Sequence, residues 1–386
     1  MKIEIAKQDL ETTLAVAGLA TGSASDLSSH YLFRIKDGKA QVLSFEQRLF
    51  AFAPLACTFE GEEGDAFTVE ASRLDKWMGG VSDGVLTLSS DGDGTVTAKG
   101  SRSKVRFRSL DPSKFPFWDS LFESRKSVGA IAPDSLARAL SVSRWFMSTD
   151  DTSKPELCQI EAVEGVLWAT DRRALSSVEV PSLPSLSIRI PGKDVSTIVR
   201  FLSNKQTTGS LVDLSESERS SEDGGGSCAI LVRGDGAYLG ITRPGVEFPT
   251  LNVDRESEPP AKIFMDRNEF GAALAVLSAS APKGHESVTF HFDQEEGALS
   301  VAMPCDAGGT NTYPLMLARV EGGENLDADF TVDHPYITGI GATFKLETLE
   351  FGVFKRGRGG YISFASEDED ESGNGNRYFS VVVWRT

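Results

Sequence analysis

Residues 3–14 read Ile-Glu-Ile-Ala-Lys-Gln-Asp-Leu-Glu-Thr-Thr-Leu, and this short stretch carries a pattern that repeats along the chain. Apolar residues first alternate, at Ile3 and Ile5, and then recur at helical spacing, at Leu10 and Leu14. Period two is typical of a half-buried strand, and period 3.6 of an amphipathic helix. The stretch therefore predicts a strand that leads directly into a helix.

The same pairing of two apolar residues, five positions apart, occurs six times at steps of about 60 to 75 residues. In most copies a short polar residue that favours a helix start lies between the two members. We therefore predict six copies of one strand–helix unit. The pairs are Ile5 and Leu10, Val69 and Leu74, Ile131 and Leu136, Ile190 and Val195, Met265 and Phe270, and Val332 and Ile337.

Alternating runs follow the predicted helices. Residues 29–36 and 39–45 are one example, and the turn at 36–38 between them, Lys-Asp-Gly, suits a hairpin reversal that needs positive φ. Similar runs at 85–89 and 95–98 flank a glycine-rich turn. Each unit then comprises a strand, a helix and about three antiparallel strands, so the predicted class is α+β.

Two Phe-Pro dipeptides indicate a longer period. Phe115-Pro116 and Phe248-Pro249 close the second and fourth units at a spacing of 133 residues, and the same step reaches the C-terminal run 381–384. Pairs of units give domains of ordinary size. We predict three tandem domains, each a duplicated unit, at residues 1–124, 125–256 and 257–386.

The composition indicates a folded acidic protein. The 386 residues are 40% hydrophobic and carry a formal net charge of −17. There is no apolar run near the roughly 20 residues that span a bilayer, and the first residues lead straight into a strand instead of a signal peptide. We predict a cytoplasmic protein without membrane contact.

The cysteines and the acidic segments do not form metal motifs. Cys57, Cys158, Cys228 and Cys305 lie too far apart for a local zinc knuckle, and no His joins them at ligand spacing, so buried free thiols are predicted. The acidic segments 215–227 and 367–375 separate strand-like runs and are interpreted as hairpin tips. A calcium loop at 367–375 is the sharper alternative, but the alternating ligands are missing.

Catalytic motifs are missing from the sequence. Residues 234–240 have the wrong glycine spacing for a dinucleotide fingerprint, and no phosphate-binding loop ends in Gly-Lys-Ser/Thr. The Ser-Arg-Ser-Lys run at 101–104 has the spacing of an acylated-serine motif but lies at a strand start. No serine or cysteine elbow accompanies the four histidines, His30, His285, His291 and His334. We predict no enzymatic activity and no cofactor.

Over its full length the chain resembles the bacterial-type sliding clamp, the beta subunit of DNA polymerase III, in a divergent or phage-encoded form. The Met-Lys start, the two Phe-Pro dipeptides and the segment 169–175 carry the resemblance. The family's segment usually reads Thr-Asp-Gly-His-Arg-Leu. Thr170, Asp171 and Leu175 match it, whereas Arg172, Arg173 and Ala174 depart from it.

The resemblance implies a head-to-tail homodimer that closes into a ring of six domains, with helices around the hole and sheets outside. Such a ring encircles double-stranded DNA without sequence specificity and tethers the replicative DNA polymerase for processivity. An ATP-driven clamp loader would open the ring. The clamp itself would need neither catalysis nor a cofactor.

Cations on the inner helices are then expected to face the DNA. For all the candidates but Arg73, a helical projection at about 100° per residue places the side chain away from the apolar stripe. The exposed faces of the first helix (Gln8, Thr12, Ala15) and of the fifth (Asn268, Ala272, Ala275) are neutral, so we expect a weakly charged channel. The candidates are Arg73, Lys76, Arg138, Lys193 and Arg200.

In this family, partner proteins insert a short peptide with a Gln and terminal hydrophobic residues into a groove between the second and third domains. An apolar trough with a few polar anchors suits such a peptide. The altered segment 172–174 is compatible with dedicated partners. The matching positions are Leu157, Thr170, Arg172, Arg173, Leu175, Pro249, Leu251, Val253, Val381, Val382, Val383 and Arg385.

The match also implies a ring seam, where an edge strand around Val105 and Phe107 meets the fifth helix of the second subunit near Val276 and Leu277. A core role for these residues inside one chain is equally compatible with the sequence. Two other classes stay open. A modular β-rich structural or virion protein would have no DNA dependence, and a hydrolase or metal-dependent enzyme would need a convergent polar cluster.

Overall fold

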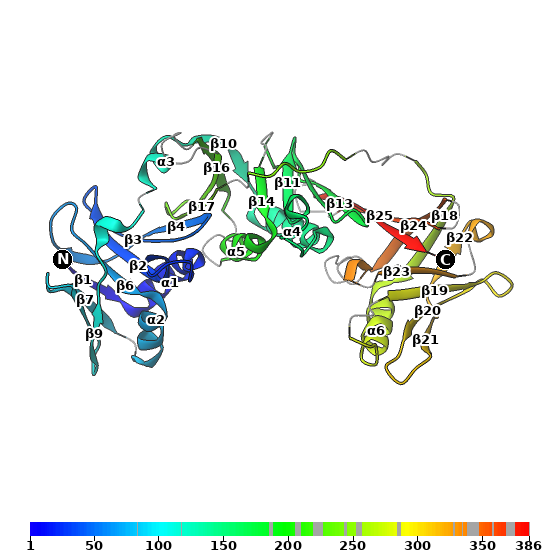
Figure 1. The fold of residues 1–386 in the computed structure, drawn as a ribbon, viewed down its shortest axis with the longest axis horizontal. Helices are drawn as coiled ribbons and strands as arrows, with labels where there is room; N and C mark the ends of the chain where they lie inside the picture. The colour runs from blue at the N-terminus through cyan, green and yellow to red at the C-terminus, as the bar shows by residue number, and fades with distance from the viewer. Residues whose placement is uncertain are drawn as a thin grey trace. The chain divides into compact units, whose positions relative to one another are not determined.

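The computed structural model of the chain (Figure 1) forms two compact units, each built from two segments. Unit 1 contains Met1–Asp134 and Ser196–Gly245, and unit 2 contains Ser135–Val195 and Val246–Thr386. The division into three tandem domains stays a prediction. The structure describes all residues except 83, 117, 185–187, 205–209, 219–226, 243–244, 252–256, 284–286, 327–328, 334, 338–346, 357–358, 368–374 and 386.

The predicted strand–helix units are present. Five strands continue into helices: β1 (Lys2–Ala6) into α1 (Lys7–Ala17), β6 (Ala66–Glu70) into α2 (Ala71–Gly80), β10 (Lys126–Ile131) into α4 (Pro133–Ser143), β14 (Ile188–Pro191) into α5 (Gly192–Leu202), and β18 (Ala261–Asp266) into α6 (Arg267–Ser278). The sixth, β23 (Asp329–Asp333), precedes helical residues 335–337, and the predicted exception Gly341 lies outside the described residues.

The predicted caps at the helix starts are only partly correct. Asp266 caps α6, because its carboxylate accepts a hydrogen bond from the Glu269 amide at 2.8 Å. The starts of α1 and α2 follow Ala6 and Glu70 and have no side-chain cap. In both, the polar residue expected as a cap, Asp9 or Ser72, lies inside the first turn instead.

Two antiparallel sheets build unit 1. One has the order β5 (Thr58–Glu60), β1, β7 (Val85–Ser90), β8 (Thr95–Lys99) and β9 (Lys104–Arg108). The other has the order β10, β15 (Val212–Glu218), β16 (Ser227–Val232), β17 (Tyr238–Thr242), β4 (Leu49–Pro54), β3 (Lys39–Glu46), β2 (His30–Lys36) and β6. The contact of β4 with β17 joins the N-terminal strands to strands from beyond residue 210.

A single sheet runs through unit 2. Its main path is β14, β11 (Gln159–Val163), β12 (Val166–Thr170), β13 (Ala174–Glu179), β26 (Arg377–Arg385), β23, β19 (Ser287–Asp293), β20 (Ala298–Pro304) and β21 (Thr310–Leu315). Strands β18, β22 (Arg319–Glu321), β24 (Thr348–Arg356) and β25 (Gly359–Glu367) attach to it off this path. The predicted α+β class is confirmed.

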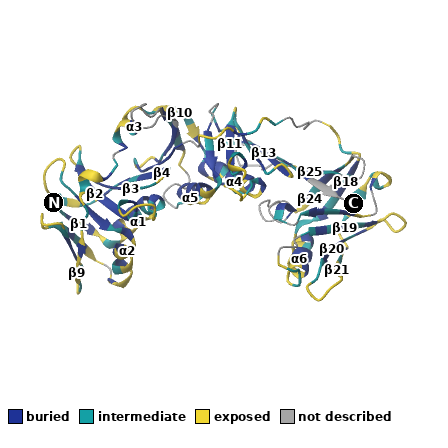
Figure 2. Cartoon of the chain, viewed as in Figure 1, coloured by how far each residue is buried: buried dark blue, intermediate teal, exposed yellow. Residues whose placement is uncertain are grey.

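Burial alternates as predicted in β1 and β19, but β2 and β3 are buried at nearly every position because both of their faces are covered, so the predicted alternation is wrong there. Figure 2 shows buried residues along the strands and on one side of the helices. In unit 1, Ile3 and Ile5 of β1 pack with Leu10 and Leu14 of α1 in one core. Within the described residues, no helix is long and apolar enough to cross a membrane. The four cysteines are free thiols as predicted, but only Cys228 is fully buried.

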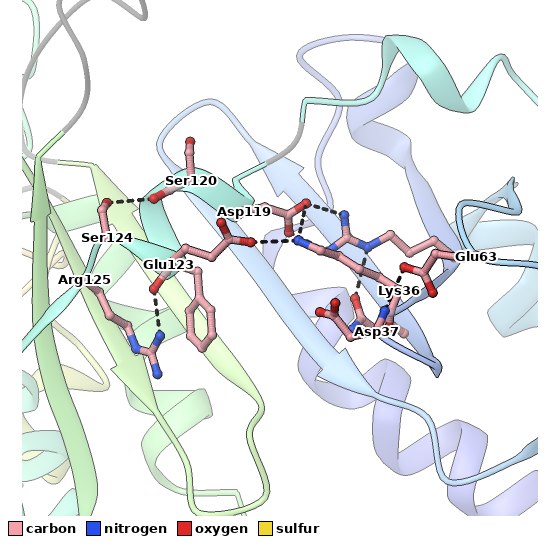
Figure 3. A network of polar contacts seen from close by, with 11 residues as sticks. Lys36, Asp37, Glu63, Asp119, Ser120, Glu123, Ser124 and Arg125 are labelled. Atoms are coloured by element: carbon pink, nitrogen blue, oxygen red, sulfur yellow. Dashed lines mark hydrogen bonds and ion pairs between the residues drawn. The ribbon is translucent and has the colours of Figure 1, made fainter.

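A short helix, α3 (Asp119–Glu123), is fixed to the eight-stranded sheet by a polar network (Figure 3). Arg34 donates two hydrogen bonds to the Asp119 carboxylate, at 2.7 and 2.6 Å. The Lys36 ammonium lies 3.2 Å from Asp119 and 2.9 Å from Glu123. Burial opposes the charge of Asp119, but the hydrogen bonds and charges of Arg34 and Lys36 outweigh it, so the pKa of Asp119 is lowered.

Candidate functional site

The five cations predicted to face DNA lie on α2, α4 and α5. Arg73, Lys76, Lys193 and Arg200 are exposed, and Arg138 is half-buried. The Arg73 guanidinium pairs with Glu70 at 2.8 Å, one turn earlier in the chain. Leu74, Leu136 and Val195 on the same helices are buried. The exposure that the projection predicted is therefore observed for Lys76, Lys193 and Arg200 but not fully for Arg138, and contact with DNA stays a prediction.

The neutral faces are also as expected. Gln8 and Ala15 of α1 are exposed and Thr12 is half-buried. Asn268, Ala272 and Ala275 of α6 are exposed. The outer surfaces of these two helices therefore offer little attraction for phosphate groups.

The predicted peptide site is assembled by strand pairing in unit 2. Strand β13 pairs with the C-terminal strand β26, so that Leu175 lies opposite Val381 and Ala174 opposite Val382. Leu157 ends a 3₁₀ turn (Pro155–Leu157) before β11 and is fully buried. The site thus unites segments that are about 200 residues apart in the sequence.

The apolar positions differ in exposure. Leu157, Leu175 and Val382 are buried, whereas Pro249, Leu251 and Val381 are half-buried. The segment that carries Pro249 is held by the Val246 carbonyl, which accepts hydrogen bonds from Gln159 at 3.1 Å and Arg189 at 3.2 Å. Val253 lies outside the described residues, and the side chains of Val383 and Arg385 are not described.

The altered turn between β12 and β13 is well organised. The Asp171 carboxylate accepts hydrogen bonds from the amides of Arg173 and Ala174, both at 2.8 Å, and the Thr170 hydroxyl accepts one from the Arg172 amide at 3.0 Å. Arg172 has a φ of 74°, in the left-handed region that favours glycine. This position is where the segment that the chain resembles usually has Gly, and here an arginine adopts the left-handed conformation.

The two arginines of the turn are exposed at its rim, at 66% for Arg172 and 67% for Arg173. Arg172 lies 3.2 Å from Glu156, and Arg173 lies 3.8 Å from Asp333. Tyr336 donates a hydrogen bond to Asp171. Burial, and then this bond to an anion, raises the pKa of Tyr336.

The predicted seam residues divide into two classes. Strand β9 is an edge strand, as expected, and its Val105 is half-buried. Val276 of α6 is 60% exposed. Phe107 and Leu277 are buried within the chain itself, at 8% and 2% exposure, so each already has a core role.

Comparisons with known proteins were made at the level of sequence and of structure. No protein-family model and no curated protein matches the sequence. Solved structures match over the full length. The DNA polymerase III beta subunit of Thermotoga maritima is 17% identical, with a TM-score of 0.79. The DNA polymerase sliding clamp of Bacillus subtilis is 14% identical, also with a TM-score of 0.79. Each match covers 100% of this chain and 99% of the other.

The chain has the sliding-clamp fold. The sliding clamp of Bartonella birtlesii bound to griselimycin also matches, with 17% identity, a TM-score of 0.78 and the same coverage. Two features of this fold were not predicted from the sequence. The network that fixes α3 joins residues about 85 apart and has no local signal. The cations on one face of β9 do have a local signal in the sequence, because they alternate at Lys104, Arg106 and Arg108.

Proposed function

We propose that this protein is a DNA sliding clamp. Two copies close head to tail into a ring around duplex DNA, and the ring tethers a replicative polymerase without sequence specificity. The full-length match to clamp structures, at TM-scores of 0.77 to 0.79 for the Thermotoga, Bacillus and Caulobacter proteins, is the observation that carries the proposal. Each chain contributes three domains, at residues 1–124, 125–256 and 257–386.

The charge distribution supports a tether rather than an affinity binder. A protein that holds DNA by affinity carries a clustered basic surface toward it. Here the inner candidates Arg73, Lys76, Arg138, Lys193 and Arg200 are few, and the net charge is −17. A closed ring needs no strong contact because its topology prevents escape. The clamp performs no chemistry, needs no cofactor, and is opened by an ATP-driven loader.

Partner peptides bind at the β13–β26 junction in this proposal. Half-buried Val381, Pro249 and Leu251 supply apolar contact, and Arg172 and Arg173 form a polar rim, while the buried Thr170 holds the turn that carries them. Ring closure uses the free edge of β9, near Val105, and the exposed Val276 on α6 of the second copy.

Single-particle electron microscopy of the purified protein tests the ring. A two-chain ring with six lobes and a hole wide enough for a duplex is expected. Three-lobed crescents would mean that closure needs a loader or DNA. Compact particles or fibres without a hole would exclude the clamp and favour a β-rich structural protein.

The peptide site has a separate test. We expect Leu175→Ala to weaken binding of a peptide with a Gln and terminal hydrophobic residues by at least about tenfold, measured by fluorescence anisotropy. Leu49→Ala is the control, because Leu49 is an equally buried leucine at a strand junction of unit 1. Equal binding by both variants would place the peptide elsewhere.

A further inference from the structure

Two turns of unit 2 carry or adjoin three positions of the predicted peptide site. One is the turn between β12 and β13, which contains Arg172, and the other is the 3₁₀ turn Pro155–Leu157. The three positions are covered by the chain itself: Leu157 is 0% exposed, Thr170 4% and Leu175 8%. A peptide gains apolar burial only against side chains that it can reach. This part of the site is therefore closed in the structure.

One ion pair connects the two turns. The Arg172 guanidinium donates a hydrogen bond to the Glu156 carboxylate at 3.2 Å. Within the described residues, no other hydrogen bond or ion pair joins residues 155–157 to residues 171–173. The turn that contains Arg172 is fixed by its internal hydrogen bonds. The pair therefore ties the 3₁₀ turn to a rigid point.

The segment 149–155, just before Glu156, has few ties to the rest of the chain. All of its residues are exposed, and its hydrogen bonds stay within residues 148–159. A segment with exposed backbone and few buried contacts opens at low cost. In the part of the chain that the structure describes, the bond from Arg172 to Glu156 is the one polar contact that holds this segment and its 3₁₀ turn to residues farther along the chain.

The backbone conformation of Arg172 points to a role for its side chain. Its φ of 74° lies in the left-handed region, which is unfavourable for any residue with a Cβ. Glycine would relieve this strain but has no side chain that could reach Glu156. A strained residue that persists indicates that its side chain serves a function.

We propose that the Arg172–Glu156 pair is a latch that keeps the peptide site closed, and that a partner peptide binds after the pair has opened. The inference rests on the peptide site of the proposed function and adds its regulation. An exposed ion pair is weak, because water competes for it and salt screens it, so the latch opens readily. Weakening the pair raises the open fraction, and with it the apparent affinity for the peptide.

The test measures binding of a peptide with a Gln and terminal hydrophobic residues, with blocked ends and no charged side chain, by stopped-flow fluorescence. Glu156→Gln keeps the size of the side chain and removes its charge. We expect about two- to fivefold tighter binding, the range that an exposed ion pair accounts for. The association rate constant should rise by this factor and the dissociation rate constant should not change, because only the open fraction differs.

Salt provides a second readout. The affinity of the unmodified protein should rise between about 0.1 and 1 M NaCl, because screening opens the latch. The affinity of Glu156→Gln should rise less over the same range. Arg172→Gln should tighten binding as Glu156→Gln does, and combining the two substitutions should add nothing, since both open the same latch.

The matched control is Glu350→Gln, which breaks an exposed ion pair with Lys262 elsewhere in unit 2. It should bind the peptide like the unmodified protein. Thermal melting should show that Glu156→Gln and Glu350→Gln are both folded and melt close to the unmodified protein.

Equal affinity of Glu156→Gln and the unmodified protein would overturn the latch and leave the peptide site standing. A gain confined to the dissociation rate constant would also overturn it, because the substitution would then have added a contact. If neither protein bound the peptide, the peptide site itself would be wrong, and the latch with it.

Discussion

Two strand junctions of this chain have corresponding backbone pairings but different side chains. In unit 1, β4 pairs with β17, and Phe50 lies opposite Gly240. In unit 2, β13 pairs with β26, and at the corresponding position after the hairpin turn Leu175 lies opposite Val381. One residue further along, the first junction has Ala51 opposite Leu239, whereas the second has Ser176 opposite Ser380.

The first junction is filled by aromatic rings. Phe50 is 1% exposed and stacks on Trp118 with ring centroids 4.6 Å apart. Gly240 is required beneath it, since a Cβ there would lie 1.9 Å from the Phe50 ring. Tyr238 stacks on Phe122 of α3 at 4.2 Å. The chain itself therefore completes this junction.

The second junction has no aromatic ring at the matched positions, where Leu175 and Val381 take the places of Phe50 and Gly240, and a pair of serines follows them. Ser176 and Ser380 are buried, and their hydroxyls have no hydrogen-bond partner within the described part of the chain. Leucine and serine side chains fill less volume than a phenylalanine ring. The same strand pairing can therefore be filled by the chain's own aromatic rings, as in the first junction, or carry smaller side chains, as in the second. This difference supports a peptide site at the second junction only.

The largest effect is expected from emptying the first junction. Phe50→Ala should lower the free energy of unfolding by about 3 to 5 kcal/mol, because it leaves a cavity beneath Trp118. Urea denaturation followed by tryptophan fluorescence measures this. A loss below about 1 kcal/mol would mean that α3 collapses into the space and that the junction is not a fixed plug.

Removing the anion from the α3 network should cost somewhat less. Asp119→Asn leaves the Arg34 guanidinium, 7% exposed, without its carboxylate, and we expect a loss of about 3 kcal/mol at pH 7. Glu123→Gln is the control, since that carboxylate is 68% exposed and should cost well under about 1 kcal/mol.

The same residue predicts a dependence on pH. The pKa of Asp119 is lower in the folded state, so its stabilisation is complete above its unfolded pKa of about 3.9 and is lost as the pH falls through the folded value. Urea titrations at pH values below about 4 should therefore show a steeper loss of unfolding free energy for the unmodified protein than for Asp119→Asn. Parallel profiles would assign the acid sensitivity to other carboxyl groups.

A smaller change is expected at the second junction. Ser176→Ala should raise the free energy of unfolding by up to about 1 kcal/mol, because it removes a buried hydroxyl without a partner. Thermal melting measures the shift, with Ser23→Ala on the exposed surface as the control. A clear loss of stability would reveal a bound water that holds the serine pair.

The smallest effect concerns the turn next to the second junction. Arg172→Gly should stabilise the chain by about 0.5 kcal/mol, since relief of the left-handed conformation, about 1 kcal/mol, exceeds the loss of the exposed pair with Glu156. Arg173→Gly lacks a positive φ and should not stabilise. If both variants behaved alike, the strain at Arg172 would be negligible.

Local patterns alone determined the strand–helix units and the α+β class. The switch of apolar period at Ile5 and Leu10 depends only on neighbouring residues, because side-chain direction in a strand or helix follows from backbone geometry. The positive φ of Asp37 and Gly38 was predictable for the same reason. Exposure of Lys76 and Arg200 also followed from helical geometry.

Tertiary structure decided what distant residues do to one another. Sequence alone left open whether Phe107 and Leu277 belong to a seam or to a core, because burial depends on everything packed around them, and both are buried within the chain. The sequence contained no indication that the Phe50 ring would lie over Gly240, since the two residues meet only when β4 and β17 pair. Contacts of this kind depend on the register between strands that lie far apart in the sequence, and no local periodicity contains that register.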